Sequence, residues 1–282
     1  MSTSPSPLVW FITGTSQGFG HELVRAALQR GDSVVATSRQ PDKVAATFKA
    51  QADRLLALSL DLGDPAAVTR GVAAALERFG RIDVLVNNAG HGLLGAVEEA
   101  SDEEIRRVYE TNVFGLIRLT RAVLPHLRKQ RRGHIVNLSS IGGLVGLPGW
   151  GIYNSTKFAV EGLSEALAVE LAPLGIKVTS VEPGPFRTDF LGTSLATTGE
   201  QIADYAATAG QTRAAATTRH GAQPGDPALA ADAIVQAVLS SNPPVHLPLG
   251  AFAFERANKK LDELRQEFAS WRDVALATDY KG

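Results

Sequence analysis

The stretch from Leu8 to Gly20 reads LVWFITGTSQGFG and opens the patterned part of the chain. A short apolar run is followed by a turn with three glycines and then by a helical pattern over 21–30. Glycines at such a turn let the backbone approach a phosphate, and a helix N-terminus offers unpaired amides with partial positive charge. The spacing differs from the common G-x-G-x-x-G pattern, so the turn alone is also compatible with a plain tight turn. We predict the first βα unit of a dinucleotide-binding sheet.

Short apolar runs alternate with longer helical patterns along the rest of the chain. We predict strands at 8–12, 33–37, 55–60, 82–86, 134–138, 176–181 and 245–247. We predict helices at 21–30, 41–52, 65–79, 102–131, 152–174 and 227–240, with Ser101 and Glu104 as a capping box. This alternation is typical of a parallel sheet, and strands without polar positions indicate helices on both faces. We therefore expect one α/β domain over 1–282, a Rossmann-type doubly wound parallel sheet of about seven strands.

Two segments depart from this pattern. Residues 186–225 are rich in Ala, Thr, Gly and Gln without a convincing strand, and we interpret them as a substrate lid. Residues 251–282 form a predicted C-terminal helical extension. Its apolar residues recur at alternating steps of three and four, as one stripe of a helix: Phe254, Ala257, Leu261, Leu264, Phe268 and Trp271. The stripe could pack on the protein's own core or contact another subunit.

Composition excludes several classes of function. The 28 basic and 29 acidic residues nearly cancel, which argues against a nucleic-acid partner. The absence of cysteine excludes disulfides and thiolate catalysis, and we predict no metal site. Residues 1–8 lack the basic start of a signal peptide, and no apolar run approaches the ~18 residues of a membrane span. We expect a cytoplasmic protein that does not bind membranes.

Tyr153 and Lys157 are four residues apart in a predicted helix and therefore share one face. A neighbouring ammonium favours the ionised phenol, whose pKa is otherwise about 10. Ser140 follows a predicted strand and could orient a carbonyl oxygen, although such a serine is also a common helix cap. Tyrosine and lysine at this spacing are frequent by chance. Combined with the glycine turn, however, they favour carbonyl and alcohol redox chemistry.

The end of the second predicted strand bears on the choice of cofactor. A carboxylate there would bind the 2′-hydroxyl of an adenosine ribose, but the chain has Ser38 and Arg39. The Arg39 guanidinium can pair with a 2′-phosphate, so we predict NADP rather than NAD, unless Arg39 is only a solvated surface charge. Asp61 after the third strand could accept from the adenine amine or cap the helix that starts near Pro65.

Several ordered motifs resemble the short-chain dehydrogenase/reductase family over about residues 8–248. Residues 13–20 match its TGxxxGxG turn, 87–90 its NNAG segment, and 183–188 its PGxxxT stretch. Residues 181–188 and 247–250 are most similar to the group related to 17β-hydroxysteroid dehydrogenases. The resemblance implies a catalytic tetrad of Asn112, Ser140, Tyr153 and Lys157. It also implies cofactor contacts from Gly14, Thr15, Ser16, Gln17, Gly18, Phe19, Gly20, Ser38, Arg39, Asp61, Leu62, Asn88, Ala89, Gly90, Tyr153, Lys157, Pro183, Gly184, Phe186 and Thr188.

This resemblance assigns a role to each member of the tetrad. Tyr153 would be the acid in reduction or the base in oxidation, and Ser140 would donate to the carbonyl oxygen. Lys157 would lower the tyrosine pKa and bind the nicotinamide ribose. Asn112 would hold a water linking Lys157 to solvent, although an asparagine in a helical pattern could also merely bond to backbone. Gln17 stands where NADP-binding members often carry a basic residue, so the NADP preference depends on Arg39.

We predict an NADP-dependent carbonyl reductase or alcohol dehydrogenase for a fairly apolar ketone or aldehyde, with a dimer or tetramer as its assembly. The alternative is a regulatory protein that binds NADP(H) as a redox signal with little turnover. An epimerase or enoyl reductase is disfavoured by the Tyr–Lys spacing and the chain length. His91 could face the substrate. The apolar candidates for a pocket wall, which could equally be core, are Trp150, Ile152, Phe186 and Phe190.

Overall fold

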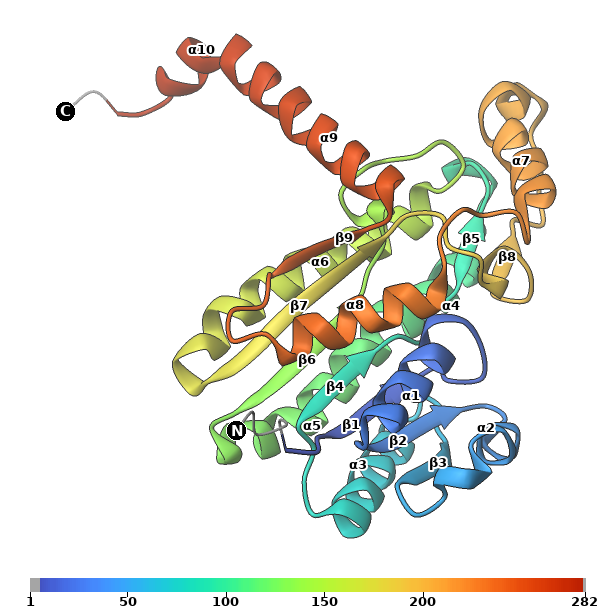
Figure 1. Ribbon diagram of the computed structural model, residues 1–282. Helices are drawn as coiled ribbons and strands as arrows, with labels where there is room; N and C mark the ends of the chain where they lie inside the picture. The colour runs from blue at the N-terminus through green and yellow to red at the C-terminus, as the bar shows by residue number, and fades with distance from the viewer. Residues whose placement is uncertain (1–5, 281–282) are drawn as a thin grey trace.

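A computed structural model describes residues 6–280. Its central sheet has seven strands in the order β3-β2-β1-β4-β6-β7-β9, and all neighbouring pairs are parallel (Figure 1). The strands are β1 (Val9–Thr13), β2 (Ser33–Ser38), β3 (Leu55–Ser59), β4 (Val84–Asn87), β6 (Gly133–Leu138), β7 (Ile176–Pro183) and β9 (His246–Leu249). The order reverses at β1, so the sheet is doubly wound. The predicted single α/β domain is confirmed, including its weak last strand.

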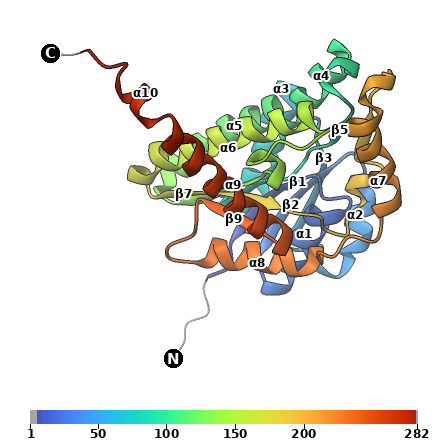
Figure 2. The same cartoon turned by 90° about the horizontal axis from the view of Figure 1, so that it is seen from above.

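Helices cover both faces of this sheet (Figure 2). Alternate side chains of β1 enter opposite cores, with Trp10 and Ile12 on one face and Phe11 on the other. Each such buried side chain contributes about 1.5–3 kcal/mol relative to exposure. The first face packs on α1 (Gly18–Arg30), α2 (Pro41–Thr47) and α8 (Pro227–Leu239); the second on α3 (Pro65–Phe79), α5 (Leu116–Gln130) and α6 (Gly151–Leu171).

Some predicted helices are interrupted. The predicted helix at 102–131 consists of α4 (Asp102–Tyr109), a π-helical segment (Glu110–Gly115) and α5, in one continuous helical run. Ser101 caps α4, since its hydroxyl accepts from the Glu104 amide and the Glu104 carboxylate accepts from the Ser101 amide. The capping box is therefore confirmed. A 3₁₀ turn (Lys49–Gln51) follows α2, and another (Ala172–Leu174) follows α6.

The expectation that 186–225 contains no strand is wrong. Strand β8 (Leu195–Thr197) pairs in parallel with β5 (Gly92–Leu94), and α7 (Gln211–Arg219) follows two short helical turns. Both strands are three residues long, too short for a sequence period to reveal them.

A buried ion pair holds this segment on the domain. Arg213 of α7 donates to both carboxylate oxygens of Glu99, at 2.6 and 3.2 Å. The same carboxylate accepts from the backbone amides of Ala96 and Ile202. Because removal of one partner leaves a buried charge, this pair fixes the segment's position strongly.

The chain ends in α9 (Ala251–Ser270) and α10 (Arg272–Leu276), which project from the body (Figures 1 and 2). Within the two helices only Ala253 and Ala257 are buried, against Ile141 and Val145. Packing of the whole apolar stripe on the protein's own core is therefore wrong beyond the base of α9. Residues 281–282 of the predicted extension, and residues 1–5 of the N-terminal segment considered above, lie outside the described part. No described helix is long and apolar enough to cross a membrane.

Candidate active site

The glycine turn lies where β1 meets α1, at the carboxyl edge of the sheet. Gly14 and Gly18 have φ values of 70° and 60°, the left-handed region in which glycine is favoured. The side-chain amide of Asn88 donates to the carbonyls of Thr13 and Gly14, at 2.7 and 3.0 Å. A Cβ on Gly20 would lie 2.3 Å from the Gly14 carbonyl oxygen. The side chain of Asn88 therefore ties the segment after β4 to the backbone of the glycine turn.

The N-terminus of α1 fits a phosphate-bearing cofactor. Its N-cap residue, Gln17, makes no side-chain cap, and the first turn has no acidic residue. The first amides of a helix have no intrahelical acceptor and carry partial positive charge. A pyrophosphate is a suitable acceptor at such a site, so the residues present fit a dinucleotide.

The ends of β2 and β3 contain the predicted adenosine contacts. Ser38 is buried and its hydroxyl accepts from the Gln40 amide at 3.0 Å, whereas Arg39 is exposed. Asp61 is exposed and accepts from the Gly63 amide at 2.8 Å. Its predicted alternative role as a helix cap is wrong, because Asp64 accepts from the first turn of α3. The neighbouring Leu62 is buried and its carbonyl accepts from Arg118.

Segment 183–193 lies across from the glycine turn. A Cβ on Gly18 would lie 3.4 Å from Thr188, and the rings of Phe19 and Phe186 are 5.2 Å apart. Gln17 donates from its amide to Asp189 and Thr193, at 3.1 and 3.0 Å. Pro183 ends β7, and the Gly184 amide bonds to β9. The predicted residues of the glycine turn and the PGxxxT stretch therefore lie side by side.

Two of the predicted tetrad residues come from α6 and one from the end of β6. Tyr153 and Lys157 are buried, and the Lys157 ammonium lies 5.7 Å from the Tyr153 ring centroid. Ser140 follows β6, and its hydroxyl accepts from the Gly142 amide at 3.0 Å and hydrogen-bonds Tyr153. Lys157 donates to the Leu138 carbonyl at 2.7 Å. The structure thus brings Ser140, Tyr153 and Lys157 together.

Asn112, the fourth member, lies in the π-helical segment and is buried. Its side-chain oxygen accepts from the His91 amide at 3.0 Å, and its amide donates to the His91 carbonyl at 2.9 Å. A third bond, 3.1 Å long, reaches the Thr156 hydroxyl on α6. Gly90 separates Asn112 from Lys157, since a Cβ there would lie within 3.7 Å of both side chains. Single-turn π segments occur often at functional sites, and this one carries Asn112.

Burial dominates the protonation of this site. Burial raises the pKa of Tyr153 to about 12, and the Ser140 hydrogen bond offsets part of the rise. Burial also lowers the pKa of Lys157 to about 8, against the opposing charge of Glu161. The predicted lowering of the tyrosine pKa by Lys157 is therefore not seen here, because Lys157 is directed to the Leu138 carbonyl and loses its own solvation.

Aromatic side chains surround Tyr153. Its ring lies 5.5 Å from both Trp150 and Phe190, and a Cβ on Gly92 would contact Trp150, Phe190 and Leu195. A cavity of about 440 Å³ adjoins this wall, lined in part by Leu94, Leu191, Leu195, Thr197 and Arg213. Phe186 packs on Phe19 instead of this wall. His91 is half-buried, and burial together with the charges of Arg107, Arg39 and Lys157 lowers its pKa.

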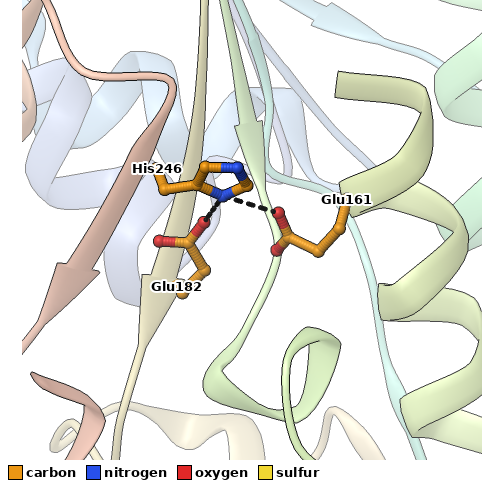
Figure 3. Close-up of side chains that lie close together, drawn as sticks. All are labelled: Glu161, Glu182 and His246. Carbon is orange, nitrogen blue, oxygen red and sulfur yellow. Dashed lines mark hydrogen bonds and ion pairs between the residues drawn. The ribbon is translucent and has the colours of Figure 1, made fainter. Parts of the chain in front are cut away.

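The sequence did not reveal a cluster of Glu161, Glu182 and His246 (Figure 3). His246 of β9 lies 3.0 Å from Glu182 of β7 and 3.5 Å from Glu161 of α6. Both carboxylates are buried, and three of their four oxygens have no hydrogen-bond partner. The signals available were the spacing of four between Lys157 and Glu161 and the position of Glu182 directly before Pro183. Among described residues, these three side chains could hold a metal ion, but a shared proton also satisfies the two carboxylates.

Protonation of Glu182 makes stability depend on pH. Burial and the neighbouring Glu161 raise the pKa of Glu182 from 4.5 to about 9. Between pH 4.5 and about pH 9 the folded state therefore binds more protons than the unfolded state. The free energy of unfolding falls as the pH rises through this range. The fall is at most about 1.4 kcal/mol per pH unit.

We expect Glu182→Gln, which resembles the protonated carboxyl, to flatten this dependence. Thermal unfolding from pH 5.5 to 8.5 should show the variant gaining on the wild type as pH rises. Glu170→Gln, at an exposed position of α6, is the matched control and should keep the wild-type slope. Parallel curves for Glu182→Gln and wild type would assign the pH dependence to other groups.

The fold and site together define a dinucleotide-binding α/β protein of the oxidoreductase type. Residues 8–199 match the family model of the short chain dehydrogenases. The chain belongs to the short-chain dehydrogenase family. Oxidoreductase BOA17 of Botryotinia fuckeliana is 38% identical over 96% of this chain and 98% of its own length. The 3-ketodihydrosphingosine reductase of Bacteroides thetaiotaomicron is 44% identical over 65% of this chain and 66% of its own.

Solved structures agree with this assignment. A short-chain dehydrogenase from Streptomyces avermitilis is 43% identical, with a TM-score of 0.91 over 98% of this chain and 100% of the other. Serine dehydrogenase complexed with NADP+ is 26% identical, with a TM-score of 0.74 over 86% and 94%. A 3-ketoacyl-(acyl-carrier-protein) reductase from Brucella melitensis, complexed with NADH, is 28% identical, with a TM-score of 0.71 over 86% and 96%. Structural neighbours thus bind either form of the nicotinamide cofactor.

Proposed function

We propose that this protein is an NADP-dependent oxidoreductase that interconverts a carbonyl and a primary or secondary alcohol, with reduction as the favoured direction. One observation carries the proposal. A buried Tyr153, with Ser140 and Lys157 beside it, lies at the carboxyl edge of the sheet next to a helix N-terminus suited to phosphates. Ligands of doubly wound sheets bind at this edge.

Each residue of the tetrad has a task in reduction. NADPH, when bound, supplies the hydride. Tyr153 donates a proton to the oxygen of the reduced carbonyl, and Ser140 donates a hydrogen bond to the same oxygen. Lys157, a buried cation, binds the nicotinamide ribose. Asn112, anchored on the His91 backbone, positions a water that returns a proton towards Lys157.

Binding of the cofactor is assigned to the predicted residues at this edge of the sheet. The glycine turn from Gly14 to Gly20 receives the pyrophosphate, the residues Asn88 to Gly90 and Pro183 to Thr188 border the nicotinamide, and Asp61 and Leu62 border the adenine. Arg39, exposed beside the buried Ser38, pairs with the 2′-phosphate. Among the described residues, no carboxylate forms an ion pair with Arg39, so its guanidinium is available.

Reversal of the charge at Arg39 tests the cofactor preference. We expect Arg39→Asp to lower kcat/KM for NADPH relative to NADH by about a hundredfold, the size of a lost charge-assisted contact of 1.5–3 kcal/mol. Lys49→Asp makes the same charge change at another exposed position and should leave the ratio unchanged. Equal ratios for Arg39→Asp and wild type would mean that another group holds the phosphate.

We propose a fairly apolar ketone or aldehyde as substrate, with 186–225 as the lid over it. The wall of Trp150, Phe190 and Leu195 supports this, as does the similarity to a relative named for reduction of a ketodihydrosphingosine. Placement in the 17β-hydroxysteroid dehydrogenase-like group is part of the proposal. The test is loss of reduced-nicotinamide absorbance with NADPH and NADH over aliphatic, aromatic and cyclic carbonyls. Tight NADPH binding without any turnover would favour a redox-sensing regulatory protein.

We also propose a homo-oligomer, a dimer or tetramer. Phe114, Phe158 and Val169 are exposed apolar side chains on the helical segments that carry Asn112 and Tyr153. A monomeric mass by light scattering at micromolar concentration would contradict this. The cytoplasmic location stays a prediction for cell fractionation.

A further inference from the structure

The two C-terminal helices, α9 and α10, form an arm without a partner along most of its length. Its 20-residue first helix is about 30 Å long. Contact with the body is limited to its base, where Ala253 and Ala257 pack near the half-buried Leu144 and Leu147. Figure 1 shows the remainder extending away from the sheet and its helices.

One side of the arm is apolar and exposed. Phe254, Leu261, Phe268 and Trp271 have exposed fractions of 60%, 53%, 70% and 67%. With Ala257 and Leu264 they recur at steps of three and four, so the pattern repeats every seven residues. This repeat is the pattern of helices that pair along a common seam. Four large apolar side chains that lie exposed along one side of a helix mark an interaction surface.

The charges beside the row indicate what covers it. Lys260 and Glu267 flank one edge of the seam, one repeat apart, and Arg265 flanks the other edge. An antiparallel copy that places Leu261 opposite Leu264 also places Lys260 opposite Glu267, and twofold symmetry makes this contact twice. A parallel copy would instead place Lys260 against Arg265. The arm is therefore complementary to itself in the antiparallel orientation.

The same register matches the apolar residues along the row. Phe254 falls opposite Trp271 of the second copy, at the exposed base of the arm. Phe268 falls at the level of Ala257, whose side chain already packs on the body, and so lies beside the half-buried Leu144 and Leu147. The tip of each arm thus reaches the base of the other, where further apolar surface is available.

A lipid surface is the competing occupant, because apolar residues on one helix face also bind membranes. Helices that lie on membranes carry an excess of Lys and Arg on their polar face. Here five basic residues are balanced by five acidic ones: Arg256, Lys259, Lys260, Arg265 and Arg272 against Glu255, Asp262, Glu263, Glu267 and Asp273. The balance favours a protein partner with its own mixed charges.

We propose that the arms of two copies of this chain pair antiparallel, with the exposed row of each covering that of the other. This goes beyond the oxidoreductase function, and it names one interface of the proposed homo-oligomer.

The mass of the assembly tests whether the exposed row of the arm forms the contact between copies. Leu261→Glu combined with Phe268→Glu changes two exposed side chains and should weaken the arm contact at least about tenfold, seen by sedimentation velocity across a concentration series. Gln266→Glu, an exposed position away from the row, should leave the mass unchanged. Unchanged sedimentation of the double variant would overturn the proposal. A wild type that does not self-associate but sediments with phosphatidylcholine vesicles would also overturn it, because the arm would then bind a lipid surface.

Charge reversal tests the orientation. Lys260→Glu should weaken the contact, and Lys260→Glu with Glu267→Lys should restore it. A tighter contact in the single variant would overturn the antiparallel arrangement, because it would relieve the repulsion expected of parallel arms. NADPH turnover is measured on the same samples. An enzyme without turnover whose arms still associate would contradict the catalytic proposal and leave the arm contact standing.

Cross-linking gives the register directly, because the chain has no cysteine. Phe254→Cys and Trp271→Cys are made as separate proteins and oxidised alone and mixed. A disulfide dimer that forms mainly in the mixture is expected. Disulfide dimers in each protein alone would indicate parallel arms, and no dimer in any sample would remove this register.

Discussion

Tyr153→Phe is expected to lower kcat for carbonyl reduction by about a thousandfold, within the 10²–10⁴ range typical of a positioned acid. The substitution removes one hydroxyl and keeps the ring that packs against Trp150 and Phe190. NADPH affinity should therefore change by less than about threefold and thermal stability only slightly, since volume-conserving changes are well tolerated. Steady-state kinetics with NADPH, together with fluorescence titration of the cofactor, separate the two effects.

Tyr109→Phe is the matched control. The hydroxyl that this variant removes also hydrogen-bonds a serine of α6, because Tyr109 donates to Ser155 at 2.8 Å. This control should retain most of the activity because its hydroxyl is not part of the proposed tetrad. Comparable turnover by Tyr153→Phe and Tyr109→Phe would remove Tyr153 from the acid role. Loss of NADPH binding in Tyr153→Phe would instead indicate a structural role.

Gly20→Ala is expected to abolish cofactor binding. Alanine normally stabilises a helix by about 1 kcal/mol relative to glycine. At Gly20, however, the new methyl group would lie 2.3 Å from the Gly14 carbonyl oxygen and 2.5 Å from the Asn88 amide nitrogen. These contacts hold the glycine turn, so relief of the clash must move it, at a cost of about 1–3 kcal/mol or more. We expect at least about a hundredfold weaker NADPH binding and a lower melting temperature.

Gly162→Ala is expected to have the opposite effect on stability. A Cβ at Gly162 meets nothing within 4 Å in the exposed part of α6, so alanine should stabilise the protein by about 0.5–1 kcal/mol. NADPH binding should be unchanged there. Isothermal titration and thermal unfolding of both variants provide the comparison. Normal cofactor affinity in Gly20→Ala would mean that the turn is not the phosphate site.

Local patterns were sufficient to predict most of the domain. The apolar runs that became β1, β2 and β4 are bounded by turn residues, and helical patterns of ten or more residues lie between the strands. Parallel order follows from that alternation because each crossover needs a helix. The proximity of Tyr153 and Lys157 was predictable for the same reason, since they share a helix face whatever the rest of the chain does.

Contacts between distant segments were not predictable in this way. β5 and β8 are each three residues long, and their pairing joins segments about a hundred residues apart. Glu99 and Arg213 are separated by 114 positions, yet form the ion pair that seats α7. His246 meets Glu161 and Glu182 only because β9 lies beside β7 and under α6. None of these pairs leaves a local period in the sequence.

Burial was also decided by the tertiary structure. The spacing of Tyr153 and Lys157 predicted a lowered tyrosine pKa, but the enclosed site raises it, because desolvation depends on every element packed around the phenol. The apolar row of α9 has the same period whether it faces the body or solvent, and only the direction of the helix shows that it is uncovered. The sequence by itself thus determined the βα alternation, the glycine turn and the shared helix face of Tyr153 and Lys157, which depend on neighbours in the chain. Pairing, burial and charge environment came from the tertiary structure, because they are properties of surfaces that meet only after the chain has folded.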